Sequence, residues 1–156
     1  MLAALCCVVV SCSDKWDDHY DARNIVSADI EIYSGDVAAY MKSQPSLSKI
    51  TGLFQSTGIL PTITPDGEYT LVLCENDALD MSVIDNDTAF VKNSISDIAV
   101  SPDKLTQNFG ILTRYETLYD KKNLRVYLRG EDTYIEDFKL TKQVKADNGY
   151  IYYVDG

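Results

Sequence analysis

The first half of the chain carries apolar residues at helical spacing. One face of the predicted helices is filled by Val37, Tyr40, Met41, Leu47, Ile50, Leu53 and Phe54. Within each half of this set, apolar residues recur three and four positions apart, as at 37, 40 and 41 and at 47, 50, 53 and 54, which predicts two amphipathic helices that face a common core. Pro45 divides the pair, Ser46 is placed to cap the second helix, and Gly58 is placed to end it.

A strand-forming stretch follows these helices. Residues 68–74 are rich in β-branched, aromatic and other apolar side chains and come after the turn signal Pro65-Asp66-Gly67, so they predict a strand. Asn76 or Asp77 is suited to cap a short helix through residues 78–79. The chain therefore passes from a buried strand into a helix.

Two further helices are predicted before the pattern changes. Apolar residues at 89–91 indicate one of them. Ser101, Pro102 and Asp103 supply a cap, a first-turn proline and a first-turn acid for another, which we expect to run to about Tyr115.

Alternation replaces helical spacing after Asn123. The apolar residues Leu124, Val126 and Leu128 alternate with Arg125, Tyr127 and Arg129. This period predicts a half-exposed strand that ends at the turn residue Gly130. Further strands are expected at Tyr134–Phe138, Lys139–Lys145 and Tyr150–Val154. Asn148-Gly149 is a strong hairpin signal, and the whole pattern predicts one α+β domain with helices first and a strand-rich C-terminal half.

Length and charge limit the function classes. The chain has 156 residues, a formal charge of -10 and a pI near 4.4. That length fits a single domain. Because nucleic acid would be repelled by such an acidic surface, nucleic acid is excluded as a partner.

The N-terminus has the features of an export signal. Residues 1–10 form an uncharged apolar run that is too short to span a bilayer. Val9-Val10-Ser11-Cys12 follows and resembles the lipobox of bacterial lipoproteins, which implies a signal peptide at 1–11 and a diacylated Cys12. Several acyl chains anchor a protein stably in a membrane. Because no Lys or Arg precedes Lys15, we expect either that the natural start lies upstream or that the sequence is a fragment.

Residues 12–33 are polar and acidic, and we interpret them as a tether between the anchor and the domain. Aspartates at 14, 17, 18 and 21 resemble the export signals of some Gram-negative lipoproteins, which favours an outer membrane lipoprotein that faces the periplasm or the cell surface. These aspartates lack the spacing of a calcium loop. No metal site and no cofactor are expected.

The sequence argues against an enzyme. No nucleophile elbow, zinc motif or P-loop occurs, and the single histidine, His19, lies in the tether. Once Cys12 is acylated and the signal peptide is removed, Cys74 is the only free thiol. Its apolar neighbours predict a buried packing cysteine.

Two stretches resemble the signatures of fasciclin domains. They are Tyr69-Thr70-Leu71-Val72-Leu73-Cys74-Glu75-Asn76-Asp77-Ala78-Leu79 and Asn148-Gly149-Tyr150-Ile151-Tyr152-Tyr153-Val154-Asp155. The resemblance covers residues 34–156 and implies a compact fold with a β-sandwich-like core, in which both signatures lie in the central sheet. The family usually continues past the point that matches Gly156, so we expect the C-terminus to be cut short.

The resemblance also implies a role. Fasciclin domains of this kind take part in adhesion, so we expect an adhesion or ligand-binding module for a protein or glycan on a cell surface or matrix. Family members known for adhesion carry a Tyr-His pair where this chain has Tyr115 and Glu116, and a histidine is usual at Tyr152. The candidate binding residues are Tyr115, Glu116, Tyr150 and Tyr152, because Tyr150 and Tyr152 share one face of a strand and are suited either to stack on a sugar or to pack. The alternative is an accessory lipoprotein of an envelope or carbohydrate-uptake complex that binds another protein.

Overall fold

The computed structural model describes residues 30–105, 113–116 and 123–156, with the backbone alone for 113–116 and Asn123. The predicted signal peptide, Cys12 and most of the predicted tether lie outside the described residues. The elements are β1 (Ile30–Ile32), α1 (Val37–Ser43), η3 (Pro45–Leu47), α2 (Ser48–Ser56), η4 (Leu60–Thr62), β2 (Tyr69–Cys74), η5 (Met81–Val83), α3 (Asp87–Asn93), β3 (Ile95–Ser96), α4 (Pro102–Leu105), β4 (Thr113–Glu116), β5 (Asn123–Arg129), β6 (Asp132–Ile135), β7 (Phe138–Ala146) and β8 (Gly149–Val154).

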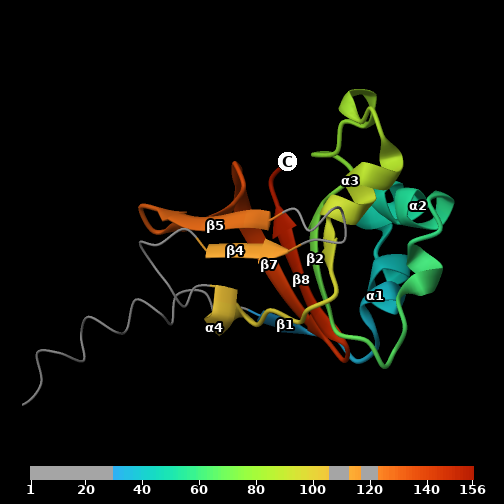
Figure 1. Ribbon diagram of the computed structural model, residues 1–156, viewed down its shortest axis with the longest axis horizontal. Helices are drawn as coiled ribbons and strands as arrows, with labels where there is room; N and C mark the ends of the chain where they lie inside the picture. Colours follow the sequence, from blue (N-terminus) through green and yellow to red (C-terminus); the bar gives the residue numbers. More distant parts are fainter. Residues whose placement is uncertain (1–29, 106–112, 117–122) are drawn as a thin grey trace, which may run out of the picture.

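The strands form a mixed sheet with the order β3-β2-β8-β7-β6-β5-β4, and β1 pairs with β7 beside this path. β2 runs parallel to β8 and β1 parallel to β7, whereas the other neighbours are antiparallel. The long strand β7 joins the two halves of the sheet, and its register with β8 shifts between Leu140 and Lys142. Because such irregularities bend a strand, the sheet curls, and β4 and β5 cross over β7 and β8 (Figure 1).

Helices α1, α2 and α3 stand on one side of β2 and β8 (Figure 1). The predicted apolar face of α1 and α2 is buried there at every position, Val37, Tyr40, Met41, Leu47, Ile50, Leu53 and Phe54. Leu71, Leu73 and Ile151 from the two signature strands are buried in the same core. The predicted α+β class, with helices packed on a strand-rich C-terminal half, is confirmed.

The turn between β7 and β8 is also confirmed, and it ties three segments together. Ala146 pairs with Gly149, so residues 147–148 form the turn. The buried Asn148 side chain accepts a hydrogen bond from the Val37 N–H at 2.8 Å and donates one to the Thr64 carbonyl at 3.1 Å. These bonds hold the start of α1 and the segment ahead of β2 against the hairpin.

The cap of α2 differs from the prediction. The Ser46 side chain does not cap this helix. Instead the Asn76 Oδ1 accepts a hydrogen bond from the Lys49 N–H at 2.9 Å, and the Asn76 Nδ2 donates to the Pro45 carbonyl at 3.0 Å. Residues 76–78 form a turn rather than the predicted helix. The structural reason is that β2 ends beside the start of α2, which gives the Asn76 amide a tertiary partner.

The helix predicted from Ser101 to Tyr115 is wrong at its end. Helix α4 covers Pro102–Leu105, the residues 106–112 lie outside the described part, and Tyr115 belongs to strand β4. β4 pairs antiparallel with β5, with Tyr115 opposite Leu124. Pairing with a strand that is distant in sequence therefore overrides the local helical periodicity.

Two strand predictions also change. Ile30–Ile32, which we placed in the tether, form β1 on the edge of β7, so the sheet starts ahead of residue 34. The strand predicted at Tyr134–Phe138 ends at Ile135, because Glu136 takes a positive φ of 55°. Its N–H bonds to the Arg125 carbonyl at 2.8 Å and turns the chain into β7.

Candidate functional site

The two tyrosines predicted on β8 do not form an exposed pair. Tyr152 is fully buried, and its hydroxyl donates to the Val100 carbonyl at 2.6 Å. Tyr150 is partly exposed and stacks on Tyr152 with 6.5 Å between ring centroids. Because the Tyr152 ring is fully enclosed by the core, only Tyr150 of this pair is open to solvent.

The candidates on β4 are placed by their backbone. Tyr115 lies opposite Leu124 and Glu116 opposite Asn123, and β4 is the last strand in the order of the sheet. The side chains of Tyr115 and Glu116 lie outside the described residues.

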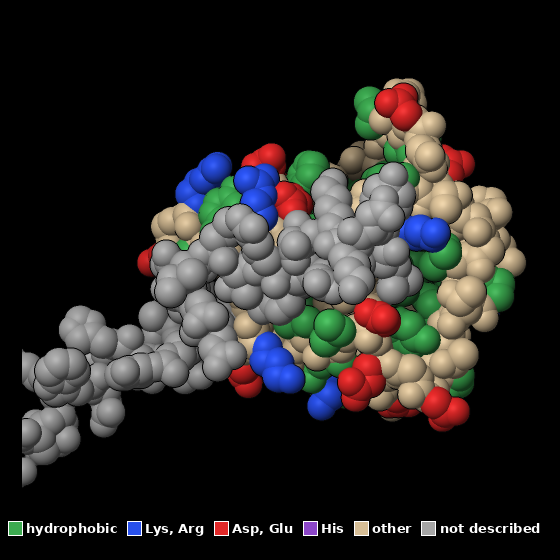
Figure 2. All heavy atoms as spheres, viewed as in Figure 1, with side chains coloured by type: hydrophobic (Ala, Val, Ile, Leu, Met, Phe, Trp, Pro, Cys, Tyr) green, Lys and Arg blue, Asp and Glu red, His purple; other side chains and the backbone are tan. Residues whose placement is uncertain are grey.

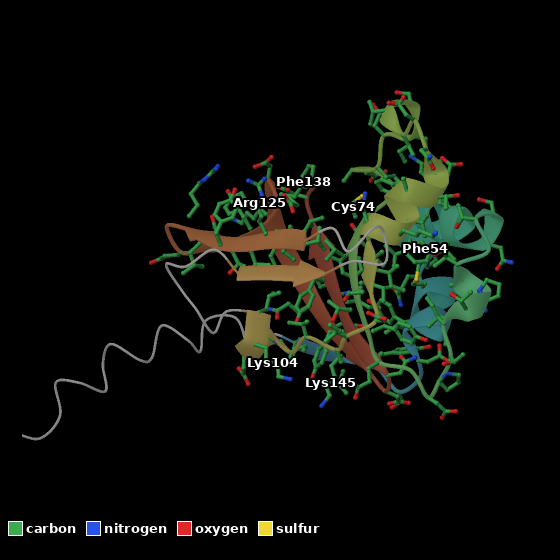
Figure 3. All side chains as sticks on the ribbon, viewed as in Figure 1. Phe54, Cys74, Lys104, Arg125, Phe138 and Lys145 are labelled. Carbon is green, nitrogen blue, oxygen red and sulfur yellow. The ribbon has the colours of Figure 1, made fainter. Side chains whose placement is uncertain are left out.

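The predicted packing role of Cys74 agrees with its position. Cys74 is a buried, free cysteine at the end of β2. Burial raises the pKa of its thiol, which disfavours the nucleophilic thiolate. It lines an apolar pocket of about 120 Å³ together with Phe138 and Val154, and Figure 3 labels Cys74 and Phe138 in the upper middle of the view.

A polar cluster joins β1, α1, β7 and β8. Lys142 Nζ lies 2.7 Å from a Glu31 carboxylate oxygen and donates to the Tyr40 hydroxyl at 3.2 Å. The Tyr153 hydroxyl donates to the same oxygen of Tyr40 at 3.2 Å. Burial, followed by this hydrogen bond, raises the pKa of Tyr153. The charged and polar groups of this cluster bond to one another, and we interpret their role as structural, holding β1 on the sheet.

The outer face of the β5–β6 hairpin gathers aromatic and cationic groups. We call this surface the hairpin face and define it by Tyr127, Arg129 and Tyr134. Arg125 and Lys139 lie outside it and are paired with Glu136 and Asp132. Tyr127 lies directly opposite Tyr134, and their rings stack with centroids 5.7 Å apart and planes 15° apart. The Arg129 guanidinium lies 4.8 Å from the Tyr134 ring centroid and 5.9 Å from that of Tyr127.

The opposite side of the same hairpin is core. Val126 and Ile135 are buried and pair with each other, whereas Tyr127 and Tyr134 are partly exposed and Arg129 is exposed. Figure 2 shows Lys and Arg side chains gathered over the β5 end of the molecule. The hairpin face therefore offers two tyrosine rings and the Arg129 guanidinium to solvent, whereas the nearby Arg125 and Lys139 are paired with acids.

Sequence reasoning found only half of this surface. The alternation along 123–129 placed Arg125, Tyr127 and Arg129 on one side of a strand. It did not place Tyr134 beside Tyr127, because that contact depends on the register between β5 and β6. The turn residue Gly130 between the two predicted strands is the local signal of the hairpin.

A second exposed feature is the segment between β2 and α3, which projects from the body at the top of Figure 1. Its Met81 and Val83 side chains are 42% and 72% exposed. Asp80 caps the short helix η5 by accepting a hydrogen bond from the Ser82 N–H at 2.9 Å. An apolar tip on such a projection is a feature of protein contact sites.

Over residues 30–105, 113–116 and 123–156, no group of three or more His, Cys, Asp or Glu side chains is arranged to hold a metal ion. Over the same residues, no helix is long and apolar enough to cross a membrane.

Comparison with known proteins gave a match in structure only. No protein-family model matches the sequence, and no curated protein matches it. The fold is similar to that of a FAS1 domain pair from the insect cell adhesion molecule fasciclin I, with a TM-score of 0.57 and 22% sequence identity. The match covers 70% of this chain and 44% of the domain pair, so the chain spans less than half of that structure. The predicted fasciclin-like fold is confirmed by this likeness.

Proposed function

We propose that this protein is an extracytoplasmic lipoprotein whose fasciclin-like domain is an adhesion or ligand-binding module. The observation that carries the proposal is the likeness of its fold to the FAS1 domains of a cell adhesion molecule. An exposed aromatic and cationic surface on the β5–β6 hairpin supports a binding role. The role is binding and not catalysis, and its ligand is a protein or glycan outside the membrane.

The proposed location rests on the lipobox-like sequence Val9-Val10-Ser11-Cys12. A diacylated Cys12 would hold the chain in the outer membrane, facing the periplasm or the cell surface. The described sheet starts at Ile30. Since an extended chain covers at most about 3.5 Å per residue, residues 13–29 give the domain a reach of up to about 60 Å from the anchor.

Lipidation is tested by growing cells with an alkyne analogue of palmitate and comparing the parent with Cys12→Ser. The parent should be labelled and should fractionate with membranes, whereas Cys12→Ser should be unlabelled. Cys74→Ser is the matched control and should be labelled like the parent, because Cys74 is buried in the domain. Equal labelling of the parent and Cys12→Ser would contradict the anchor.

The binding role is tested with the purified full chain on a glycan array and in a pull-down from solubilised cell envelopes. Specific retention of a glycan or a protein supports the module. A chain that is folded by circular dichroism but retains neither would contradict it.

A second candidate function is that of an accessory lipoprotein that docks on another envelope protein. It is favoured by the exposed apolar tip at Met81 and Val83. In this case the double variant Met81→Ser, Val83→Ser should lose the partner recovered by pull-down. Ile98→Ser is the matched control, since Ile98 is 51% exposed and lies in another segment. Equal recovery with all three proteins would exclude the tip as the docking site.

A further inference from the structure

We propose that the hairpin face binds a polysaccharide that contains uronic acids, with Tyr127 and Tyr134 contacting the sugar ring and Arg129 pairing with its carboxylate. The inference rests on the proposed binding function and names the ligand class and the residues. It differs from the sequence hypothesis, which placed the sugar contact on β8.

The first argument is the aromatic surface. The C–H groups on the face of a pyranose ring are apolar, and they pack on aromatic side chains as other apolar groups do. Tyr127 and Tyr134 stack on each other with nearly parallel planes, so a sugar packs on the ring surface that this stack leaves open, and the two hydroxyl groups supply polar partners for sugar hydroxyls. Both rings are held by their strands, so little conformational entropy is lost when a ligand binds.

The second argument is the charge of Arg129. Arg125 lies 2.8 Å from a Glu136 carboxylate oxygen, and Lys139 lies 2.8 Å from one of Asp132. Asp132 lies opposite Arg129 in the register of β5 and β6, but its carboxylate is paired with Lys139, and among the described residues Arg129 forms no ion pair of its own. A guanidinium binds carboxylates through two parallel hydrogen bonds, so Arg129 can pair at short range with one carboxylate of a ligand, whereas the formal charge of -10 on the whole chain repels extended polyanions such as nucleic acid.

The third argument is the distance between the two features. The Arg129 guanidinium lies 4.8 Å from the Tyr134 ring centroid. A uronic acid carries its carboxylate directly on the pyranose ring, so one residue places the carboxylate and the apolar ring face side by side. An acidic peptide carries its carboxylate on a flexible stem with no ring to stack, and a neutral sugar leaves the Arg129 guanidinium with its two aromatic contacts and no anion. The uronic acid satisfies both features at once.

The exposed position of Arg129 on the hairpin allows it to be substituted without disturbing the fold. Arg129 is exposed, and the core side of the hairpin is formed by other residues. Figure 3 shows Arg125 on β5, the strand that also carries Arg129. Arg125 is therefore a matched control, since it is an arginine on the same face of the same strand that is already paired with acids.

The test is isothermal titration calorimetry on the full chain with α-1,4-linked tetragalacturonate and with the same tetrasaccharide after reduction of its carboxyl groups. The parent should bind the acidic form more tightly than the reduced form by about tenfold, because the reduced form loses a charge-assisted hydrogen-bonded pair. Arg129→Gln should weaken tetragalacturonate binding by about tenfold and abolish the preference. Arg125→Gln removes the same charge and should leave both nearly unchanged.

The aromatic contribution is tested in the same way. Tyr134→Ala should weaken binding of both tetrasaccharides, and Tyr134→Phe should retain most of the affinity because the ring remains. Circular dichroism and thermal melting of each variant establish that it is folded.

Three results would overturn the inference. Equal losses in Arg125→Gln and Arg129→Gln would show general attraction of a polyanion, and so would equal binding of poly-aspartate. No binding of tetragalacturonate by the parent would exclude this ligand class, while retention of another glycan or a protein would leave the proposed binding module standing. If the parent binds no tetragalacturonate and also retains no glycan or protein on the array and in the pull-down, the proposed binding function is contradicted as well.

Discussion

At the scale of single residues, the turn before β8 shows how one small side chain decides the packing of two strands. Gly149 does not have a positive φ, so the turn does not require glycine for its backbone conformation. Glycine is required here because the backbone of β2 lies close to Gly149. A Cβ at this position would collide with the Tyr69 carbonyl oxygen. The parallel pairing of β2 with β8 therefore depends on the absence of a side chain at Gly149.

Gly149→Ala should destabilise the fold by about 3 kcal/mol, because the added carbon meets a backbone atom that is itself held in the sheet. Gly52→Ala is the matched control. Gly52 lies inside α2 with open space around it, so alanine there should raise the free energy of unfolding by up to about 1 kcal/mol. Urea unfolding of both variants measures the two effects, and a stable Gly149→Ala protein would contradict the close approach of β2.

At the scale of elements, the N-terminus of α2 is capped by Asn76, which follows the C-terminal end of β2. Asn76 accepts from the Lys49 N–H, and its amide donates to the Pro45 carbonyl and to the Ser48 hydroxyl oxygen at 2.9 Å. Lys49 Nζ in turn donates to the Asn76 carbonyl at 2.7 Å. The helical pair and the sheet are thus joined at a helix end, which leaves α2 dependent on the folded β2 segment.

Asn76→Ala should lower the free energy of unfolding by about 1 to 2 kcal/mol, the cost of losing a helix cap. Ser46→Ala, at the position that sequence reasoning chose for the cap, should change it by less than about 0.5 kcal/mol. Chemical unfolding followed by circular dichroism compares them. If Ser46→Ala is the more destabilised variant, the cap assignment is wrong.

At the scale of the whole molecule, the cluster of Lys142, Tyr40, Tyr153 and Glu31 links the first strand to the last. Burial alone would lower the pKa of Lys142, but its hydrogen bonds to Glu31 and Tyr40 outweigh this, and its pKa is raised. The pKa of Tyr153 is also raised, chiefly by burial. A raised pKa in the folded state means that the folded protein holds these protons more tightly than the unfolded chain does.

The stability that these two groups contribute should therefore be complete below about pH 10 and lost as the pH rises above the ordinary values of 10.0 for tyrosine and 10.5 for lysine. Thermal melts between about pH 8 and pH 11 measure this loss. Tyr153→Phe cannot ionise at this position, so its melting temperature should fall less steeply over that range than that of the parent. An identical slope in both proteins would contradict the role of Tyr153.

The candidate binding surface illustrates the limit of sequence reasoning. The alternation around Tyr127 and Arg129 is local and predicted an exposed strand face. The cross-strand contact with Tyr134 and the pairing of Arg125 with Glu136 depend on register and on the turn at Glu136, which local patterns do not specify. The same limit explains Tyr152. The alternation along the strand predicted that Tyr152 and Tyr150 share one face. Whether that face is buried at Tyr152 depends on the packing of residues 95–100 beside β2 and β8, which the alternation does not contain.

By itself, the sequence determined the properties that arise from neighbours along the chain. Helical spacing determined which sides of α1 and α2 are buried, and turn residues determined the hairpin between β7 and β8, because both act over a few residues. The tertiary structure alone decided the parallel pairing of β2 with β8, the capping of α2 by Asn76, the strand at Tyr115 and the hairpin face. These features bring together residues that are far apart in sequence or set by strand register, and their free energy comes from hydrogen bonds and buried contacts that no local pattern contains.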